Sequence, residues 1–233
     1  MIDEASLSNV RERIEKALLR TYQQSKHQQV EVVAVTKGFP HEAIINAAKF
    51  GLTSIGENRV QEAESKFAKL PNDIMINRRL VGHLQSNKAH RAVDLFDTID
   101  SVDSLKLAKK LSSLGKARSS PLNILLQVNV DRDPAKKGFN PIATEDLLEV
   151  IDMEGLNVSG LMTIGTLTTD QFIKRETFQK LRRLRTSLNN QLSPKRRLEH
   201  LSMGMSGDFE IAIEEGATMV RIGTALFGAR PST

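Results

Sequence analysis

Short apolar runs alternate with amphipathic segments along nearly the whole chain. Residues 1–28 carry apolar side chains at intervals of three or four residues, which predicts a helix that packs one face onto the rest of the protein. These side chains belong to Leu7, Val10, Ile14, Ala17, Leu18 and Tyr22. The rhythm changes at residues 30–36, VEVVAVT, where β-branched residues predict a strand. A helical pattern that ends near Gly51 follows this strand.

The same succession of strand and helix recurs to the end of the chain. The predicted strands cover residues 30–36, 53–55, 80–81, 95–99, 122–130, 156–162, 198–201 and 218–222. Helical segments are expected near residues 44–50, 57–70, from 85, 102–114, 142–151, 174–185 and 209–215. Strands that read as continuous apolar runs are typical of a parallel sheet covered by helices.

This pattern predicts an α/β protein of the (β/α)8 TIM-barrel class, with an extra N-terminal helix. An open, doubly wound sheet is the alternative, but no glycine-rich dinucleotide motif follows residues 30–36. No long linker and no repeat beyond the strand–helix succession interrupts the chain. We therefore expect one domain over residues 1–233, with residues 1–28 packed on the barrel.

Composition narrows the class of protein. With 39% hydrophobic and 26% charged residues, the 233-residue chain falls in the range of ordinary folded proteins. The absence of cysteine excludes disulfides, thiolate metal sites and cysteine nucleophiles, and it favours a reducing compartment. Charges recur every few positions near the N-terminus, and no segment is apolar over a membrane-spanning length. We expect a cytoplasmic protein with no membrane association.

The charge balance favours anionic partners only mildly. There are 33 basic and 28 acidic residues, a net charge of +5. Part of the excess lies in residues 174–185, KRETFQKLRRLR, where apolar residues keep helical spacing and predict an amphipathic helix with a solvated basic face. The chain has one tyrosine and no tryptophan, so the aromatic residues that stack on bases are scarce, and we expect no nucleic-acid partner.

In a barrel of this class, chemistry gathers where the strands end at the carboxyl face. Lys37 terminates the apolar first strand, where partial desolvation would lower the pKa of its amine and make it a nucleophile toward an aldehyde. A lysine can also end a strand without any chemical role. The other residues near strand ends, all polar or small except Met162, are Glu57, Asn58, His83, Ser101, Asn129, Met162, Thr163, Ser202, Arg221, Gly223 and Thr224.

Two segments near the end of the sequence could form an anion site. Ser206 and Gly207 lie at the predicted start of the penultimate helix, and Gly223-Thr224 follows the last strand. Helix N-termini and glycine turns present N–H groups to anions, although Ser206 could simply cap its helix and Gly223 could form a plain turn. The loops after strands seven and eight are the usual phosphate site of this fold, which favours the anion site.

His83, in GHLQSNK, could act as an acid or base, but a lone histidine beside a strand end is more often a hydrogen-bonded structural residue. No histidine or carboxylate stands at metal-ligand spacing from it, so we expect no metal site. Asp131 and Asp133 are expected to form turns rather than a catalytic carboxylate pair.

Several motifs together resemble the pyridoxal phosphate homeostasis protein family, single-domain relatives of the barrel half of bacterial alanine racemase. They are AVTK ending at Lys37, GEN at 56–58, GHLQSNK at 82–88, GLMT at 160–163, LSMGMSGD at 201–208 and VRIGTALFG at 220–228. The resemblance covers nearly the whole chain, and the spacing of LSMGMS and VRIGT is its most specific feature.

The resemblance implies that Lys37 holds pyridoxal 5′-phosphate (PLP) as a Schiff base. It implies that the phosphate is bound by Ser206, Gly223 and Thr224, and that Arg221 faces the pyridine nitrogen. Asn58, His83 and Met162 match further cofactor-binding positions of the family. One departure is Gly38-Phe39, which replaces a more polar pair often present in relatives and leaves the shape of the cavity mouth open.

The function implied by the resemblance is to carry or buffer PLP and to regulate vitamin B6 and amino-acid balance, without appreciable turnover. Apo-enzymes that use PLP are the expected acceptors, and we expect a monomer. One alternative is a PLP-dependent enzyme acting on amino acids, such as a racemase, and another is a basic phosphate- or nucleic-acid-binding module.

Racemisation needs a base on each face of a planar intermediate, and the resemblance implies that alanine racemases take the second base, a tyrosine, from a C-terminal domain. The single tyrosine here, Tyr22, is expected to pack on the barrel, and nine residues follow Thr224. We therefore expect no appreciable racemase activity.

Overall fold

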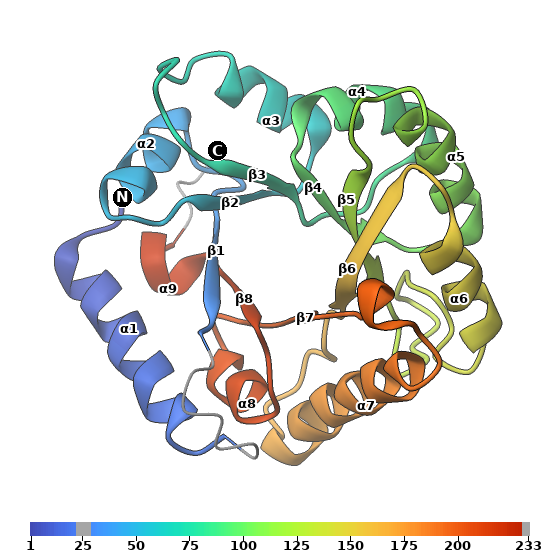
Figure 1. Cartoon of the computed structure of the whole chain (residues 1–233). Helices are drawn as coiled ribbons and strands as arrows, with labels where there is room; N and C mark the ends of the chain where they lie inside the picture. The colour runs from blue at the N-terminus through green and yellow to red at the C-terminus, as the bar shows by residue number, and fades with distance from the viewer. Residues whose placement is uncertain (22–28, 230–233) are drawn as a thin grey trace.

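Eight parallel strands form a closed barrel at the centre of the molecule (Figure 1). The computed structural model describes residues 1–21 and 29–229. Neighbouring strands follow one another in chain order, and β1 closes the ring by pairing with β8, for example Val33 with Arg221. The strands are β1 (Glu31–Val35), β2 (Ser54–Glu57), β3 (Asn77–Leu80), β4 (Thr98–Val102), β5 (Leu122–Gln127), β6 (Leu156–Met162), β7 (His200–Met205) and β8 (Met219–Ile222). The predicted (β/α)8 barrel is confirmed.

Helices surround this barrel on its outer side (Figure 1). The α-helices are α1 (Glu4–Leu18), α2 (His41–Lys49), α3 (Val60–Phe67), α4 (Ala89–Leu95), α5 (Leu105–Gly115), α6 (Thr144–Asp152), α7 (Gln171–Asn189), α8 (Phe209–Glu214) and α9 (Thr224–Phe227). Two 3₁₀ turns, η1 (Ser86–Lys88) and η2 (Pro194–Arg196), complete the described elements. Each helix turns an apolar face to the strands, so the main core lies between barrel and helices.

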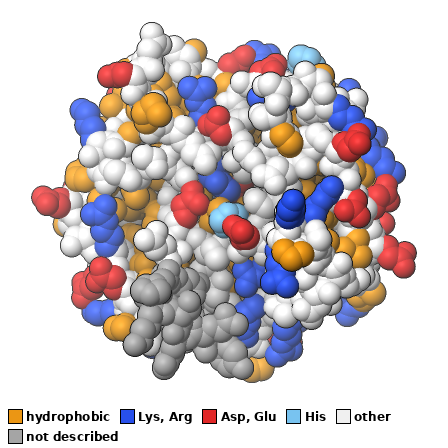
Figure 2. All heavy atoms as spheres, in the orientation of Figure 1, with side chains coloured by type: hydrophobic (Ala, Val, Ile, Leu, Met, Phe, Trp, Pro, Cys, Tyr) orange, Lys and Arg blue, Asp and Glu red, His pale blue; other side chains and the backbone are white. Residues whose placement is uncertain are grey.

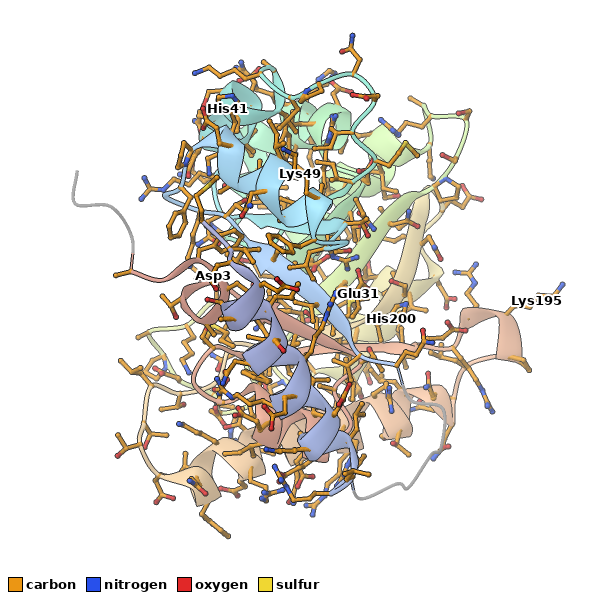
Figure 3. All side chains as sticks on the ribbon, turned by 90° about the vertical axis from the view of Figure 1, so that its left-hand side faces the viewer. Asp3, Glu31, His41, Lys49, Lys195 and His200 are labelled. Carbon is orange, nitrogen blue, oxygen red and sulfur yellow. The ribbon has the colours of Figure 1, made fainter. Side chains whose placement is uncertain are left out.

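The interior of the barrel is not purely apolar. Arg79 on β3 and Asp100 on β4 form a buried pair, with 3.0 Å between Nη2 and Oδ1. The Arg79 Nη1 atom also lies 3.7 Å from Glu31 at the start of β1. In the side view of Figure 3, Glu31 and His200, the first residues of β1 and β7, lie near each other at one end of the barrel, where they line a shared hollow.

Helix α1 packs across the outside of the barrel next to α8 (Figure 1). Its first turn is capped by Asp3, whose carboxylate accepts a hydrogen bond from the Ser6 amide at 2.7 Å. Leu7, Val10, Ile14 and Ala17 are buried, as their spacing predicted. The helix ends at Leu18, and the expectation for Tyr22 lies outside the described residues.

Several predicted boundaries are wrong by a few residues. Leu95 closes α4 instead of opening the fourth strand, because the apolar run at 95–99 spans a helix end and a strand start. Val102 ends β4, and the next helix starts only at Leu105, after the capping residue Ser104. Residue 57 belongs to β2 rather than to the following helix, and β7 is longer than predicted.

The stripe of apolar residues on the basic helix α7 is buried as predicted, but its basic face is only partly solvated. Arg175 pairs with Glu214 at 2.5 Å and with Glu215 at 2.8 Å, and Arg182 lies 3.1 Å from Glu215. Over the face shown in Figure 2, basic and acidic side chains are interspersed. The basic residues of α7 therefore help to fix α8.

Within residues 1–21 and 29–229, no helix is both long and apolar enough to cross a membrane. In the same part of the chain, histidine and carboxylate side chains form no group of three or more that could hold a metal ion.

Candidate functional site

A cavity of about 410 Å³ opens where the strands end. This volume is in the range typical of small-molecule sites. Seven of the eight predicted site residues line it, namely Lys37, Asn58, His83, Ser206, Arg221, Gly223 and Thr224. Residues that are far apart in the sequence thus meet at one end of the barrel, as expected for side chains that follow parallel strands.

Lys37 stands on a tight turn directly after β1. The Thr36 amide continues the strand pairing by donating to the Gly56 carbonyl at 3.0 Å, and the Phe39 amide closes the turn by donating to the Thr36 carbonyl at 3.0 Å. Lys37 is half-buried at the cavity wall. Phe39 also lines the cavity and packs on Phe227, with 5.3 Å between ring centroids. The Gly38-Phe39 departure therefore gives the mouth an apolar wall.

Ser206 joins the two loops predicted to bind an anion. Its Oγ accepts hydrogen bonds from the amides of Gly223 and Ala225, both at 3.2 Å. A hydroxyl that accepts two hydrogen bonds still has its own proton to donate. Ser206 does not cap α8, because Asp208 precedes that helix and Ser206 lies in the turn before it. The hydroxyl is thereby fixed on the cavity wall with its proton available to an anion.

Arg221 supplies a buried positive charge. On β8, it donates to Ser202 Oγ at 2.8 Å and to the Thr163 carbonyl at 2.7 Å, which fixes the plane of the guanidinium group. Burial lowers the pKa of Arg221 to about 10, against the opposing effect of Asp100 and Asp208. The group remains protonated at neutral pH.

Asn58 and His83 are brought together by the close approach of two loops. A Cβ atom at residue 82 would lie 2.3 Å from the carbonyl oxygen of Asn58, so only glycine allows this contact. Ser101 Oγ, inside β4, donates to the Gly82 carbonyl at 2.6 Å and fixes the loop. His83 Nδ1 lies 2.8 Å from the Asp103 carboxylate, which orients the ring.

Met162 does not line the cavity. Its side chain is fully buried with Leu125 and Met219 in the barrel interior. The position of a residue near a strand end does not decide whether its side chain lies at the mouth or in the layer below it, so we assign Met162 to packing. Asp131 and Asp133 stabilise loops as expected: Asp131 accepts from Thr177 Oγ1 at 2.9 Å, and Asp133 accepts from the Ala135 amide at 2.9 Å.

The sequence patterns missed the apolar part of the lining. Besides Phe39, it consists of Val35, Val81, Ile164 and Met205. These residues read as ordinary strand or loop positions, although the exposure of Ile164 and Met205 is unusual for large apolar side chains. Together they give the cavity walls suited to a flat, partly apolar ligand.

The lining fits PLP. A primary amine is present for the aldehyde, a serine hydroxyl and a glycine turn for the phosphate, and a buried guanidinium for a ring with anionic substituents. A Cβ placed on Gly207, in the same wall, would meet no heavy atom within 4 Å, so this loop leaves open space for a ligand.

Comparison with known proteins agrees with this geometry. The family model described as alanine racemase, N-terminal domain, matches residues 8–231. A pyridoxal phosphate homeostasis protein of Vibrio alginolyticus is 40% identical over 205 residues, 86% of this chain and 87% of that protein. The protein of the same name from Pseudomonas aeruginosa is 43% identical over 202 residues, 86% of this chain and 85% of that protein.

Solved structures of similar proteins have the same fold. PipY of Synechococcus elongatus with PLP bound superposes with a TM-score of 0.80 at 36% identity, covering 92% of this chain and 100% of that chain. Alanine racemase of Clostridium difficile has a TM-score of 0.74 at 16% identity, covering 99% of this chain but 58% of the racemase, and this likeness concerns the fold alone. The chain belongs to the pyridoxal phosphate homeostasis protein family, whose barrel corresponds to the N-terminal domain of alanine racemase.

Proposed function

We propose that this protein binds PLP in the cavity at the carboxyl ends of the strands and carries or buffers it for PLP-dependent apo-enzymes. The observation that supports this most directly is the meeting of Lys37, Arg221 and the Ser206–Gly223–Thr224 loops around one cavity. The family membership of the chain, and the relative that is described with PLP bound, point to the same ligand. Regulation of vitamin B6 and amino-acid balance would follow from control of the free cofactor.

These residues would contact different parts of PLP. Ser206 would donate its hydroxyl proton to the phosphate, while Gly223 and Thr224 keep the adjacent loop close to it. When bound, PLP would supply an aldehyde, the group with which a primary amine condenses with release of water, and Lys37 would provide that amine. Arg221, which stays positively charged, would lie near the ring and would disfavour a proton on the pyridine nitrogen. Without that proton the ring is a poor electron sink, which suits a carrier better than an enzyme.

Covalent attachment tests this proposal. The purified protein is mixed with PLP, reduced with borohydride and digested, and mass spectrometry locates the modified lysine. We expect the adduct on Lys37, and its loss from that peptide in Lys37→Ala. Lys49→Ala is the matched control, because Lys49 is an exposed lysine on α2 (Figure 3). An adduct confined to Lys88 or Lys137 in the wild-type protein would contradict the assignment.

A PLP-dependent enzyme is the second candidate, since alanine racemase shares the fold. Turnover assays separate the two functions. We further propose that the protein acts in the cytoplasm, as its cysteine-free sequence favours, and as a monomer.

A further inference from the structure

A buried group of charged side chains lies directly behind the turn that carries Lys37. It consists of Glu57 at the end of β2 and of Glu62 and Lys66 on α3. The Lys66 ammonium lies 2.7 Å from a carboxylate oxygen of each glutamate. The side chains of Lys66 and Glu57 are 8% and 0% exposed, so two charges have been taken out of water.

This group contacts the residues on both sides of Lys37. On one side, Lys66 Nζ donates to the Thr36 carbonyl at 2.8 Å, and Thr36 Oγ1 donates to Glu57 at 2.6 Å. On the other side, the Gly38 amide donates to Glu62 at 2.6 Å. Gly38 has a φ of 74°, a conformation that favours glycine, so the backbone turns sharply at this point. The peptide groups that flank Lys37 are thereby fixed from one centre.

Packing alone does not account for such a group. Burial raises the pKa of Glu57, against the opposing effect of Lys66 and Thr36, and among the described residues the second carboxylate oxygen of Glu57 has no hydrogen-bond partner. Apolar residues of similar volume would usually fill such a space at no cost in stability. What apolar residues would not provide is a set of directed hydrogen bonds to residues 36 and 38.

We propose that Lys66 is a positioning residue for Lys37, which acts through Glu57, Glu62 and the Thr36–Gly38 turn to hold the amine of Lys37 toward the aldehyde of the bound cofactor. This inference rests on the proposed function, because it assigns a role in forming the covalent bond with PLP. Loss of the group should slow bond formation while leaving the phosphate and ring contacts of the cavity in place.

The test separates covalent from non-covalent binding. Pyridoxine 5′-phosphate, in which a hydroxymethyl group replaces the aldehyde, reports the non-covalent contacts by calorimetry. The rate of bond formation is followed by the change in visible absorbance after mixing with PLP. Because Lys66→Met alone leaves Glu57 buried without its cation, the double variant Glu57→Gln/Lys66→Met is measured beside it. Lys69→Met is the matched control, since Lys69 is exposed just beyond the end of α3.

We expect the double variant to bind pyridoxine 5′-phosphate as the wild type does, and to attach PLP about 10- to 100-fold more slowly, which is the effect of a small misplacement of a reacting group. Lys69→Met should match the wild type in both measurements. Attachment at the wild-type rate in the double variant would overturn the proposal. So would a parallel loss of both kinds of binding together with a lower melting temperature, because that result indicates a merely structural role. Failure of the wild-type protein to bind pyridoxine 5′-phosphate would overturn the proposed function itself, and this inference with it.

Discussion

Ser206 shows how much of the proposed phosphate site depends on a single hydroxyl. It accepts two amide hydrogen bonds from the loop after β8, so the same atom organises that loop and presents a proton to the cavity. Removing it would take one donor from a bound phosphate and leave the amides of Gly223 and Ala225 without their acceptor. The first effect weakens anion binding directly, and the second removes the contact that holds the loop after β8 against Ser206.

We predict that Ser206→Ala weakens the binding of pyridoxine 5′-phosphate by about 1–3 kcal/mol, the scale of one hydrogen bond to a charged group. Calorimetric titration measures the change directly. Ser193→Ala is the control, because Ser193 is exposed and precedes η2, outside the cavity lining. Equal affinities in the wild type and Ser206→Ala would place the phosphate elsewhere.

Single residues also show where sequence patterns stop being informative. Lys37 and Arg221 could be assigned to the mouth because they lie at or near the ends of apolar strands, and the barrel brings such positions together. Met162 could not be separated from them, since its burial depends on the inclination of β6 and on the size of its neighbours. The burial of Lys66 could not be recognised either, because a lysine on a predicted helix is usually exposed to solvent and nothing in the neighbouring sequence marks this one as buried.

Among the elements, α1 is held against α8 by ion pairs as well as by apolar packing. Arg13 lies 2.6 Å from Glu210 and 4.4 Å from the centre of the Phe209 ring. Arg20 lies 2.7 Å from Glu214, which also binds Arg175 of α7. Burial would raise the pKa of Glu214, but hydrogen bonds from Arg175 and Arg20 outweigh it and hold the pKa below the usual value of 4.5.

A lowered pKa makes the contribution of Glu214 depend on pH in a definite direction. The unfolded chain takes up this proton first as the pH falls, so the stabilisation is present above pH 4.5 and is lost as the pH falls through the lower pKa of the folded state. We predict that Glu214→Gln lowers the free energy of unfolding by about 1 kcal/mol at pH 7, and by progressively less below pH 4.

Urea unfolding at a series of pH values checks this prediction. Glu15→Gln is a suitable control, because Glu15 is exposed on α1 and forms no ion pair within the described part of the chain. A difference between the wild type and Glu214→Gln that stays constant down to pH 3 would contradict the linkage argument.

Element boundaries were the weaker part of the sequence prediction, for a physical reason. Apolar residues recur both at the end of a buried helix and at the start of the next strand, so the run at 95–99 could not be divided by hydrophobicity. The division follows instead from hydrogen bonding: the amide of Phe96 still donates to the Ala92 carbonyl of α4, while the amide of Asp97 already donates to the Arg78 carbonyl of β3.

At the scale of the whole molecule, the fold was predictable because eight apolar runs separated by helices suit few architectures other than a closed parallel barrel. The register of the strands was not predictable from the sequence. The buried pair of Arg79 and Asp100 inside the barrel was not predictable either, because both residues lie at the polar ends of predicted strands. The barrel itself is therefore encoded in a periodic pattern, while the charges inside it depend on exact neighbours in space.

Whether the site performs racemisation depends on which acid–base groups the whole barrel brings to the cavity. That reaction removes the α-proton of an amino acid bound to the cofactor and returns a proton to the opposite face, so it needs an acid–base group on each face. In the proposed site, Lys37 would be one such group. The single tyrosine of the sequence, Tyr22, lies outside the described residues, and among those described the titratable side chains lining the cavity besides Lys37 are His83 and Arg221.

The positive charge of Arg221 is a second argument against racemisation. With a pKa of about 10, Arg221 is positively charged at neutral pH, and in the proposed position beside the pyridine nitrogen this charge would disfavour the proton that lets the ring accept the electrons of the α-carbon. His83 is the only remaining candidate for a second base among the described lining residues, and its Nδ1 is already engaged by Asp103.

We therefore predict that the PLP-loaded protein has no appreciable racemase activity. The measurements are a coupled assay for D-alanine and the exchange of the alanine α-proton in deuterated water, with alanine racemase as the positive control. Lys37→Ala and His83→Ala show whether any turnover belongs to this cavity. Turnover of about 1 per second or faster, the lower end of ordinary enzymatic rates, that is lost in both variants would establish His83 as the second base and make the protein an enzyme rather than a carrier.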